Sequence, residues 1–135
     1  MNEASDIVVV GAGIVGLAHA WAAARRGLRV TVVERDHRCV GASIRNFGFV
    51  TVTGQPAGDT WRRARASREL WAELASQAGI TIEHRGLWLL ARRPRAAAVL
   101  QAFMDTEMAE GNVLYDAQEA AALAPMLRTE GATAA

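Results

Sequence analysis

The chain has 135 residues, enough for one ordinary domain with a hydrophobic core. Its 15 basic and 14 acidic residues give a net charge of +1, which argues against bulk attraction to nucleic acid or to an anionic membrane. Hydrophobic residues make up 51% of the chain, which argues against global disorder, and a single cysteine excludes an intramolecular disulfide.

A buried strand and a glycine turn are the first predicted elements. Residues 7–10 form a β-branched run typical of a parallel strand buried on both faces. Gly11, Gly13 and Gly16 follow in the spacing G-x-G-x-x-G. Gly11 allows a tight turn, Gly13 removes a Cβ that would block a pyrophosphate, and Gly16 lets the next helix pack closely. The N-terminus of that helix offers free N–H groups and a positive dipole to phosphate.

A second strand with an acidic residue at its end completes the unit. Gly27 lies where a left-handed glycine ends the helix, and residues 28–33 form the strand. Glu34 follows it, 18 positions after Gly16, where a carboxylate accepts hydrogen bonds from both hydroxyls of an adenosine ribose. It would also repel the 2′-phosphate of NADP. The pattern predicts a bound adenine dinucleotide; the alternatives are a glycine-rich turn that binds nothing and a solvated carboxylate.

The apolar run over residues 7–24 is long enough to imitate a membrane span or a signal peptide. Acidic residues precede it where a signal peptide is positive, its glycines have the phosphate-turn spacing, and Arg25 and Arg26 end it as a helix terminus would. We therefore expect a soluble, cytoplasmic protein without a membrane span.

Residues 35–50 are predicted to be irregular, and a loop leaving this edge of the sheet should run along the cofactor. A helix is predicted over residues 59–78, capped by Asp59 or Thr60 and ended by Gly79. Its apolar face comprises Trp61, Ala64, Trp71, Leu74, Ala75 and Ala78. Its arginines, Arg62, Arg63, Arg65 and Arg68, lie mostly on the other side. We expect them to be solvated, the alternative being contact with an anionic substrate.

The last third of the sequence predicts two short strands and two helices. Residues 80–83 and 87–91 suggest a hairpin or neighbouring strands. Pro94 opens a helix over about residues 95–110, with an inward face of Val99, Leu100, Phe103 and Met104. A short helix over residues 116–123 stops before Pro125. The last residues show no strand and no hydrophobic anchor. A doubly wound sheet needs more strands than these, so we expect an incomplete architecture.

The glycine turn, Glu34 and the segment G-A-S-I-R-N-F-G over residues 41–48 together resemble the N-terminal part of the D-amino-acid oxidase family. This FAD-dependent family includes glycine oxidase, sarcosine oxidase and D-amino-acid dehydrogenase. The resemblance implies an α/β fold: the N-terminal βαβ portion of an FAD-binding Rossmann-like domain over residues 1–80. The start of a substrate domain then covers residues 81–127, and residues 128–135 form an irregular tail.

The resemblance also implies a cofactor-binding set, in which residues 41–48 lie along the FAD. Arg35 either stacks on adenine or pairs with phosphate, or is solvated; Ser43 and Asn46 either bond phosphate and ribityl oxygens or bond their own backbone. Gly48 either admits the flavin ring or acts as a loop hinge. The expected set is Gly11, Gly13, Ile14, Val15, Gly16, Glu34, Arg35, Ala42, Ser43, Asn46, Phe47 and Gly48.

The activity implied by the resemblance is oxidation of the C–N bond of a small amine or amino acid, with hydride passing to the flavin. The match to a bacterial subgroup linked with phosphonate breakdown makes an aminophosphonate a candidate substrate. Family members run to several hundred residues, and their substrate-binding groups come later. We therefore expect no catalytic residue in this chain, weak or absent FAD binding and no amine turnover.

Two other hypotheses stay open from the sequence: an NAD-dependent dehydrogenase-type domain, and a truncated non-catalytic remnant. A metal site is not expected, because His19, His37 and His84 are scattered and lack ligand spacing. No Ser/His/Asp set with a nucleophile-elbow pattern supports hydrolysis.

Overall fold

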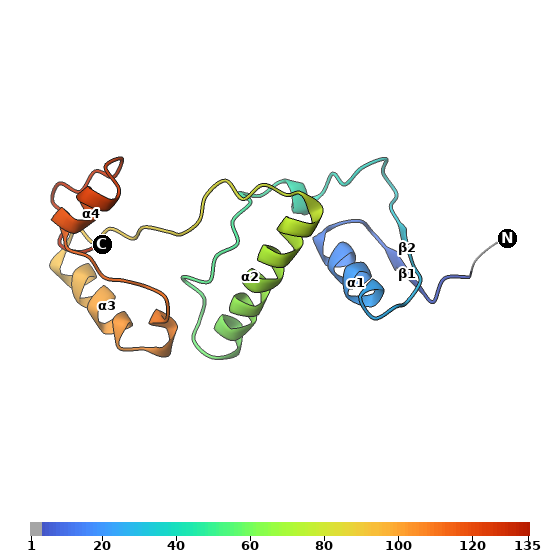
Figure 1. The fold of residues 1–135 in the computed structure, drawn as a ribbon, viewed down its shortest axis with the longest axis horizontal. Coiled ribbons are helices and arrows are strands. Elements are labelled where there is room, and N and C mark those ends of the chain that lie inside the picture. The colour runs from blue at the N-terminus through green and yellow to red at the C-terminus, as the bar shows by residue number, and fades with distance from the viewer. Residues whose placement is uncertain (1–3) are drawn as a thin grey trace. The chain divides into compact units, whose positions relative to one another are not determined.

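The computed structural model describes residues 4–135, and the chain divides into two compact units after residue 49. Figure 1 shows the order of the elements along the chain. The first unit holds one strand–helix–strand motif and a single 3₁₀ turn, and the second holds three α-helices and another 3₁₀ turn.

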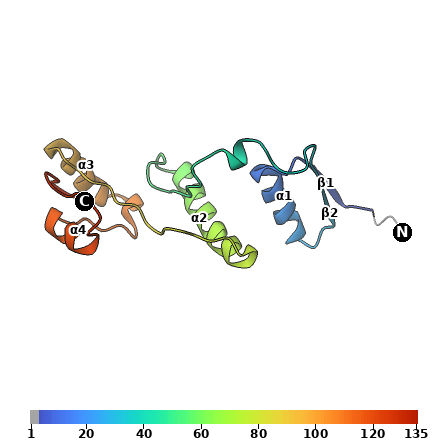
Figure 2. The same ribbon diagram turned by 90° about the horizontal axis from the view of Figure 1, so that it is seen from above.

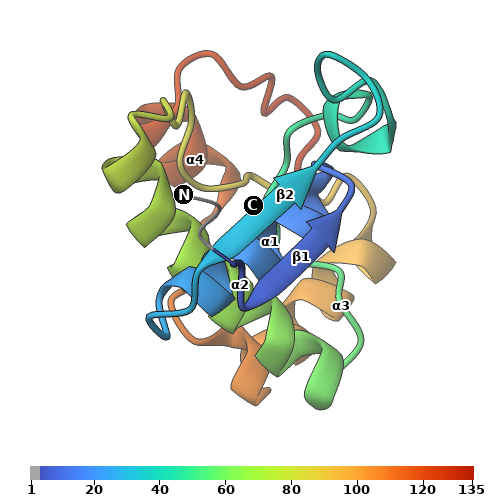
Figure 3. The same cartoon turned by 90° about the vertical axis from the view of Figure 1, so that its right-hand side faces the viewer.

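The first unit is a parallel β-α-β motif. Strands β1 (Ile7–Val10) and β2 (Val30–Val33) pair in parallel, and α1 (Ile14–Ala24) connects them. Figure 3 shows both strands side by side, with α1 behind them. The register places Ile7 opposite Val30 and Val10 opposite Val33. The predicted strand, glycine turn, helix and second strand are thus confirmed.

Gly27 ends the helix as the sequence predicts. Its φ is 78°, and its N–H donates to the Ala24 carbonyl oxygen at 2.9 Å. The Leu28 N–H donates to the Ala23 carbonyl oxygen at 3.3 Å. This pair of bonds is the Schellman arrangement, in which a left-handed glycine turns the chain away from the helix axis. The turn sends the chain directly into β2.

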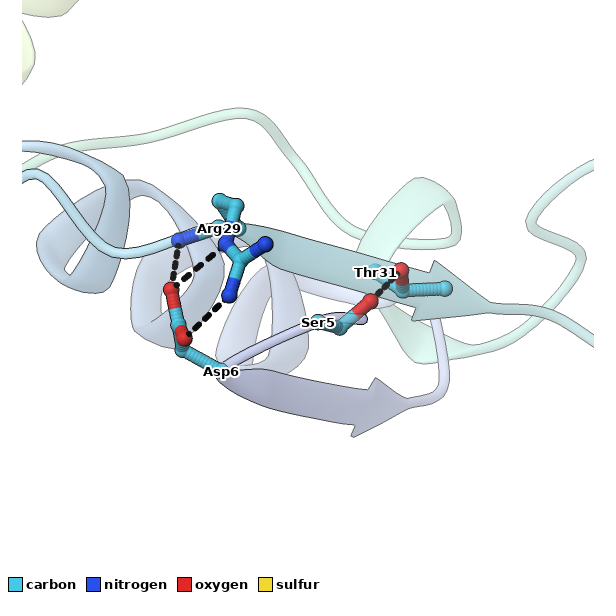
Figure 4. A network of polar contacts seen from close by, with 4 residues as sticks. All are labelled: Ser5, Asp6, Arg29 and Thr31. Atoms are coloured by element: carbon cyan, nitrogen blue, oxygen red, sulfur yellow. Dashed lines mark hydrogen bonds and ion pairs between the residues drawn. The ribbon is translucent and has the colours of Figure 1, made fainter. Parts of the chain in front are cut away.

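Polar contacts tie the amino-terminal ends of the two strands together (Figure 4). Asp6 accepts hydrogen bonds from the backbone N–H, Nε and Nη2 of Arg29, at 2.9, 3.1 and 2.9 Å. The Arg29 side chain holds the pKa of Asp6 below its usual range. The Ser5 and Thr31 hydroxyls form a second hydrogen bond across the strands. These contacts lie at the end of the sheet opposite the glycine turn.

Burial of β1 on both faces was the wrong expectation for this chain. Val8 is 57% exposed and Val10 is 85% exposed. Within the described residues the sheet has only two strands, and α1 packs on one face of it. The outer edge of β1 and the face away from α1 therefore remain open to solvent.

In the second unit, α2 (Asp59–Ala78) has the predicted bounds and ends at Gly79, whose φ is 65°. The predicted cap is wrong, because Gly58 occupies the N-cap and Asp59 instead pairs with Arg62 at 2.7 Å in the first turn. Trp61 is only 6% exposed. Three of the four arginines are exposed, in line with the solvated face expected; Arg65 is half-buried.

The predicted hairpin is wrong. Residues 80–90 run as an extended segment without strand pairing, visible in Figures 1 and 2 as the stretch after α2. The one pairing of this region is an antiparallel bridge between Ala91 and Ala134. A short extended run becomes a strand only when a neighbour satisfies its backbone groups, and within residues 4–135 none does.

The helix predicted over residues 95–110 is interrupted. Helix α3 (Pro94–Met104) ends at Asp105, and the 3₁₀ turn η2 (Glu107–Ala109) follows. The Thr106 hydroxyl donates to the Phe103 carbonyl oxygen at 2.7 Å while the Thr106 backbone is extended. A side chain that bonds the backbone in this way competes with helix continuation. Val99, expected inward, is 67% exposed.

The final helix and the tail are held by local contacts. Helix α4 (Ala117–Leu123) begins at the capping box of Asp116 and Glu119. The sequence shows no hydrophobic anchor for the tail, whose backbone is irregular, but hydrogen bonds hold it in place. The Arg92 guanidinium donates to the carbonyl oxygens of Arg128 and Glu130, and Ala135 exchanges two backbone hydrogen bonds with Tyr115. Among the described residues, no helix combines the length and apolarity needed to cross a membrane.

Candidate nucleotide-binding site

The glycine turn between β1 and α1 favours glycine at position 11 by its backbone conformation and at position 16 by lack of space. Gly11 has a φ of 102°, which favours glycine. A Cβ on Gly16 would lie 2.0 Å from the Gly11 carbonyl oxygen and 3.3 Å from Val9 Cγ1. The close approach of α1 to the turn therefore requires glycine at position 16, as the sequence predicts.

Gly13 lies beside Ser43, which belongs to the loop that follows β2 in the chain. It is the N-cap of α1, with extended backbone at φ −69° and ψ 171°. A Cβ there would lie 3.1 Å from Ser43 Oγ. The same oxygen accepts a hydrogen bond from the Ile14 N–H at 2.8 Å. Residues far apart in sequence thus meet at the helix N-terminus, where the space left by Gly13 lies.

Several backbone donors at this turn have no protein partner. Within residues 4–135, the N–H groups of Gly13, Val15 and Gly16 donate to no protein acceptor. The first turn of α1 contains no acidic residue that would neutralise the positive end of the helix. The free amides and the positive end of the helix make this N-terminus suited to an anion such as phosphate.

Glu34 binds the turn from the end of β2. Its Oε2 accepts from the Ala12 N–H at 2.7 Å, and its Oε1 accepts from the N–H groups of Arg35 and Asp36 at 2.8 and 3.2 Å. The side chain is half-buried. The backbone N–H of Ala12, and next that of Asp36, hold the pKa of Glu34 below its usual range. The carboxylate is therefore ionised at neutral pH.

The segment 41–48 carries its own hydrogen-bond network. Its 3₁₀ turn η1 (Ala42–Ile44) is followed by Asn46, whose Nδ2 donates to the carbonyl oxygens of Ala42 and Ser43. Asn46 Oδ1 accepts from the Gly48 N–H at 2.7 Å. The contacts of Asn46 are those of turn chemistry, and a role toward a cofactor stays a prediction.

The remaining predicted site residues are exposed. Ile14 and Val15 begin α1 and are exposed, and the Arg35 side chain pairs with Asp36 at 3.4 Å. Phe47 is 88% exposed and stacks with Phe49 at a centroid distance of 5.9 Å. Among the described residues, no group of three or more potential ligand side chains could hold a metal.

Sequence reasoning missed Ala12. Its contribution is a backbone N–H that the Glu34 carboxylate binds across 22 positions of sequence. Nothing in the side chain of an alanine signals this role. The position between two glycines was the one available sign, because it marks a turn whose backbone amides are exposed.

Comparison with known proteins agrees with this geometry. A family model described as FAD dependent oxidoreductase matches residues 6–135. One of the subunits of opine oxidase from Rhizobium meliloti is 37% identical over 70 residues, covering 49% of this chain. The structure of L-proline dehydrogenase from P. horikoshii superposes with a TM-score of 0.78 at 25% identity, over 99% of this chain. The structure of glycine oxidase from Bacillus cereus superposes with a TM-score of 0.74 at 24% identity, over 97% of this chain. This second likeness is one of fold alone.

The proteins it matches are longer than this chain. The aligned segments cover between 6% and 18% of the length of the curated relatives. The opine oxidase subunit is the one covered to 18%. The chain covers 36% of the proline dehydrogenase chain and 38% of the glycine oxidase chain. The resemblance therefore covers almost all of this chain but about a third of each solved relative.

Proposed function

Because this chain belongs to the family of FAD dependent oxidoreductases, we propose that it is the nucleotide-binding portion of a flavoenzyme that oxidises a C–N bond. The observation that carries the proposal is the glycine turn with three unpartnered amides, flanked by Glu34 and by Ser43. These groups come from three separate segments and converge on one helix N-terminus. Their chemistry suits a dinucleotide, with phosphate at the helix and ribose at the carboxylate.

The residues present fit FAD at its adenosine and pyrophosphate half. The amides of Gly13, Val15 and Gly16 would hold phosphate oxygens, and the absent Cβ of Gly13 leaves room for them. Glu34 would accept a ribose hydroxyl, and Ser43 would turn its hydroxyl from Ile14 toward the phosphate. When bound, FAD supplies the hydride acceptor for the oxidation, and the protein supplies orientation and electrostatics.

The proposed substrate is a small amine or amino acid, with an aminophosphonate as the narrower candidate. L-proline dehydrogenase carries a name that places its substrate among the amino acids, which supports this proposal. We assign no catalytic residue to this chain. We propose that the groups that bind the substrate lie in the larger share of the relatives that it does not match.

Amide chemical shifts of the full chain, titrated separately with ADP, FAD and NAD, test the cofactor assignment. ADP should shift the amides of Gly13, Val15 and Gly16 at millimolar concentration, and FAD should also shift residues 41–48. No shift at the turn with saturating ADP would refute the nucleotide site. Equal shifts of residues 41–48 with NAD and FAD would refute the preference for FAD.

Activity needs a separate test. We expect the chain alone to hold FAD too weakly to retain it through purification and to oxidise no amine, since it spans only about a third of each solved relative. A purified sample with stoichiometric flavin absorbance and oxidase activity would overturn this expectation. Reading the coding DNA beyond codon 135 in all three frames tests whether related flavoprotein sequence accompanies this segment.

A further inference from the structure

The Glu34 carboxylate is already engaged with the protein before any nucleotide is considered. Its two oxygens accept from three backbone N–H groups, those of Ala12, Arg35 and Asp36. A carboxylate has about four lone-pair sites for hydrogen bonds. About one site therefore remains for a ribose, which is fewer than the two hydroxyl contacts expected from the sequence.

We propose that Glu34 is a positioning residue of the glycine turn, in addition to the ribose contact predicted for it. The Ala12 amide that it binds lies between Gly11, with φ 102°, and Gly13, at the start of α1. Holding this one amide fixes the turn between two conformationally free residues. The neighbouring amides of Gly13, Val15 and Gly16 then stay unpartnered and available to phosphate. The inference rests on the proposed nucleotide site but not on the identity of the dinucleotide.

The physical need for such a tether comes from the two glycines. A glycine loses more conformational freedom on ordering than any other residue, so the G-x-G turn costs entropy to hold in one shape. A charge-assisted bond from the end of β2 offsets part of that cost in the free protein. The nucleotide then meets a turn that is already ordered, and less of its binding free energy is lost to ordering.

Ser43 makes the corresponding contact on Ile14, but with different properties. Its neutral hydroxyl comes from the loop 41–48, and its bond to the Ile14 N–H is exposed. The bond from Glu34 to Ala12 is part-buried and involves an ionised acceptor. Charge-assisted bonds are roughly twice as strong as neutral ones. We therefore expect the hydrogen bond from Ala12 to Glu34 to persist when a nucleotide binds, and the bond from Ile14 to Ser43 to be replaced by a contact with phosphate.

Substitution of Glu34 by glutamine separates the two roles. A glutamine amide still has one oxygen to accept and an NH₂ to donate to ribose hydroxyls. It cannot serve all three backbone amides, because its NH₂ end would face an N–H donor, either that of Ala12 or those of Arg35 and Asp36. Glu34→Asp keeps the charge but is one methylene shorter, so we expect it to bond the nearby Asp36 amide and to fall short of Ala12.

Amide hydrogen exchange, measured by NMR on the full chain without nucleotide, tests the proposal. In the wild type, Ala12 should exchange more slowly than Val15 and Gly16. In Glu34→Gln it should exchange about tenfold faster, as expected for loss of a hydrogen bond to a charged group. Glu34→Asp should have the same effect at Ala12. The matched control is Glu83→Gln, an exposed glutamate in the other unit, which should leave Ala12 unchanged.

The outcomes distinguish this proposal from the nucleotide site itself. Unchanged Ala12 protection in both Glu34→Gln and Glu34→Asp, with weaker ADP binding, would make Glu34 a ribose ligand only and overturn the proposal, whereas faster exchange in either variant supports it. Wild-type Ala12 that exchanges as fast as Val15 would also overturn it. Faster Ala12 exchange in a protein that binds no ADP would refute the nucleotide site and leave the tether supported.

Discussion

Replacement of Gly16 by alanine tests the packing of α1 against the turn. The added Cβ would lie 2.0 Å from the Gly11 carbonyl oxygen and 3.1 Å from the Gly11 carbonyl carbon. An ordinary carbon–oxygen contact is about 3.3 Å, so the two groups must separate by about 1.3 Å. Both belong to the backbone of one tight turn, so no side chain can rotate away to relieve the contact.

The net cost follows from two opposing terms. Inserting a methyl group into a site without room costs about 1–3 kcal/mol, and the 2.0 Å contact places this case at the upper end. Alanine inside a helix regains up to about 1 kcal/mol over glycine. We therefore expect Gly16→Ala to lower the free energy of unfolding by about 2 kcal/mol. For a chain of this size that lowers the melting temperature by roughly 5–10 °C.

Gly41→Ala is the matched control. A Cβ at Gly41 meets nothing within 4 Å, and the backbone there is extended with φ −85°. It should change the free energy of unfolding by no more than about 0.5 kcal/mol. Urea and thermal unfolding, followed by circular dichroism, measure both variants. A Gly16→Ala protein as stable as the wild type, or a Gly41→Ala protein equally destabilised, would refute the packing argument.

Three further predictions follow from other contacts. Gly13→Ala should leave unfolding within about 1 kcal/mol of the wild type, since its Cβ meets only the movable Ser43 hydroxyl, yet weaken ADP binding about tenfold or more in an NMR titration. Trp61→Ala should cost about 3–5 kcal/mol in urea unfolding, because the ring is only 6% exposed; a loss below 1 kcal/mol would contradict its core role. Because backbone amides, first that of Ala12, lower the folded pKa of Glu34, its contribution to stability should be present above the ordinary value of 4.5 and be lost as pH falls through the folded pKa. Melting temperatures across this range should therefore fall less steeply in Glu34→Gln than in the wild type, and identical slopes would contradict the assignment.

The sequence by itself determined the features whose causes are local. The β-α-β unit, the need for glycine at position 16 and the bounds of α2 all follow from side-chain spacing and from backbone preferences within a few residues. Gly27 and Gly79 could be assigned as left-handed helix ends because only glycine adopts that conformation at little cost. The acidic position after β2 was found from spacing alone.

Tertiary structure decided every feature that depends on a distant partner. Residues 80–90 include residue types typical of strands. No neighbouring strand in the described chain pairs with them, so the hairpin does not form. The tail is anchored because Ala91 and Tyr115, remote in sequence, pair with Ala134 and Ala135. Such contacts leave no periodic pattern in the sequence, because each joins a single pair of backbone groups that only the path of the folded chain brings together.

The candidate site shows the same division. Its glycines and Glu34 are recognisable by spacing, whereas the partner of Glu34 is a backbone amide, and every residue except proline has one. Only the pairing of the two strands brings Glu34 Oε2 to 2.7 Å from the Ala12 nitrogen, across 22 positions of sequence. The sequence therefore determined which carboxylate belongs to the site, and the tertiary structure decided what that carboxylate holds.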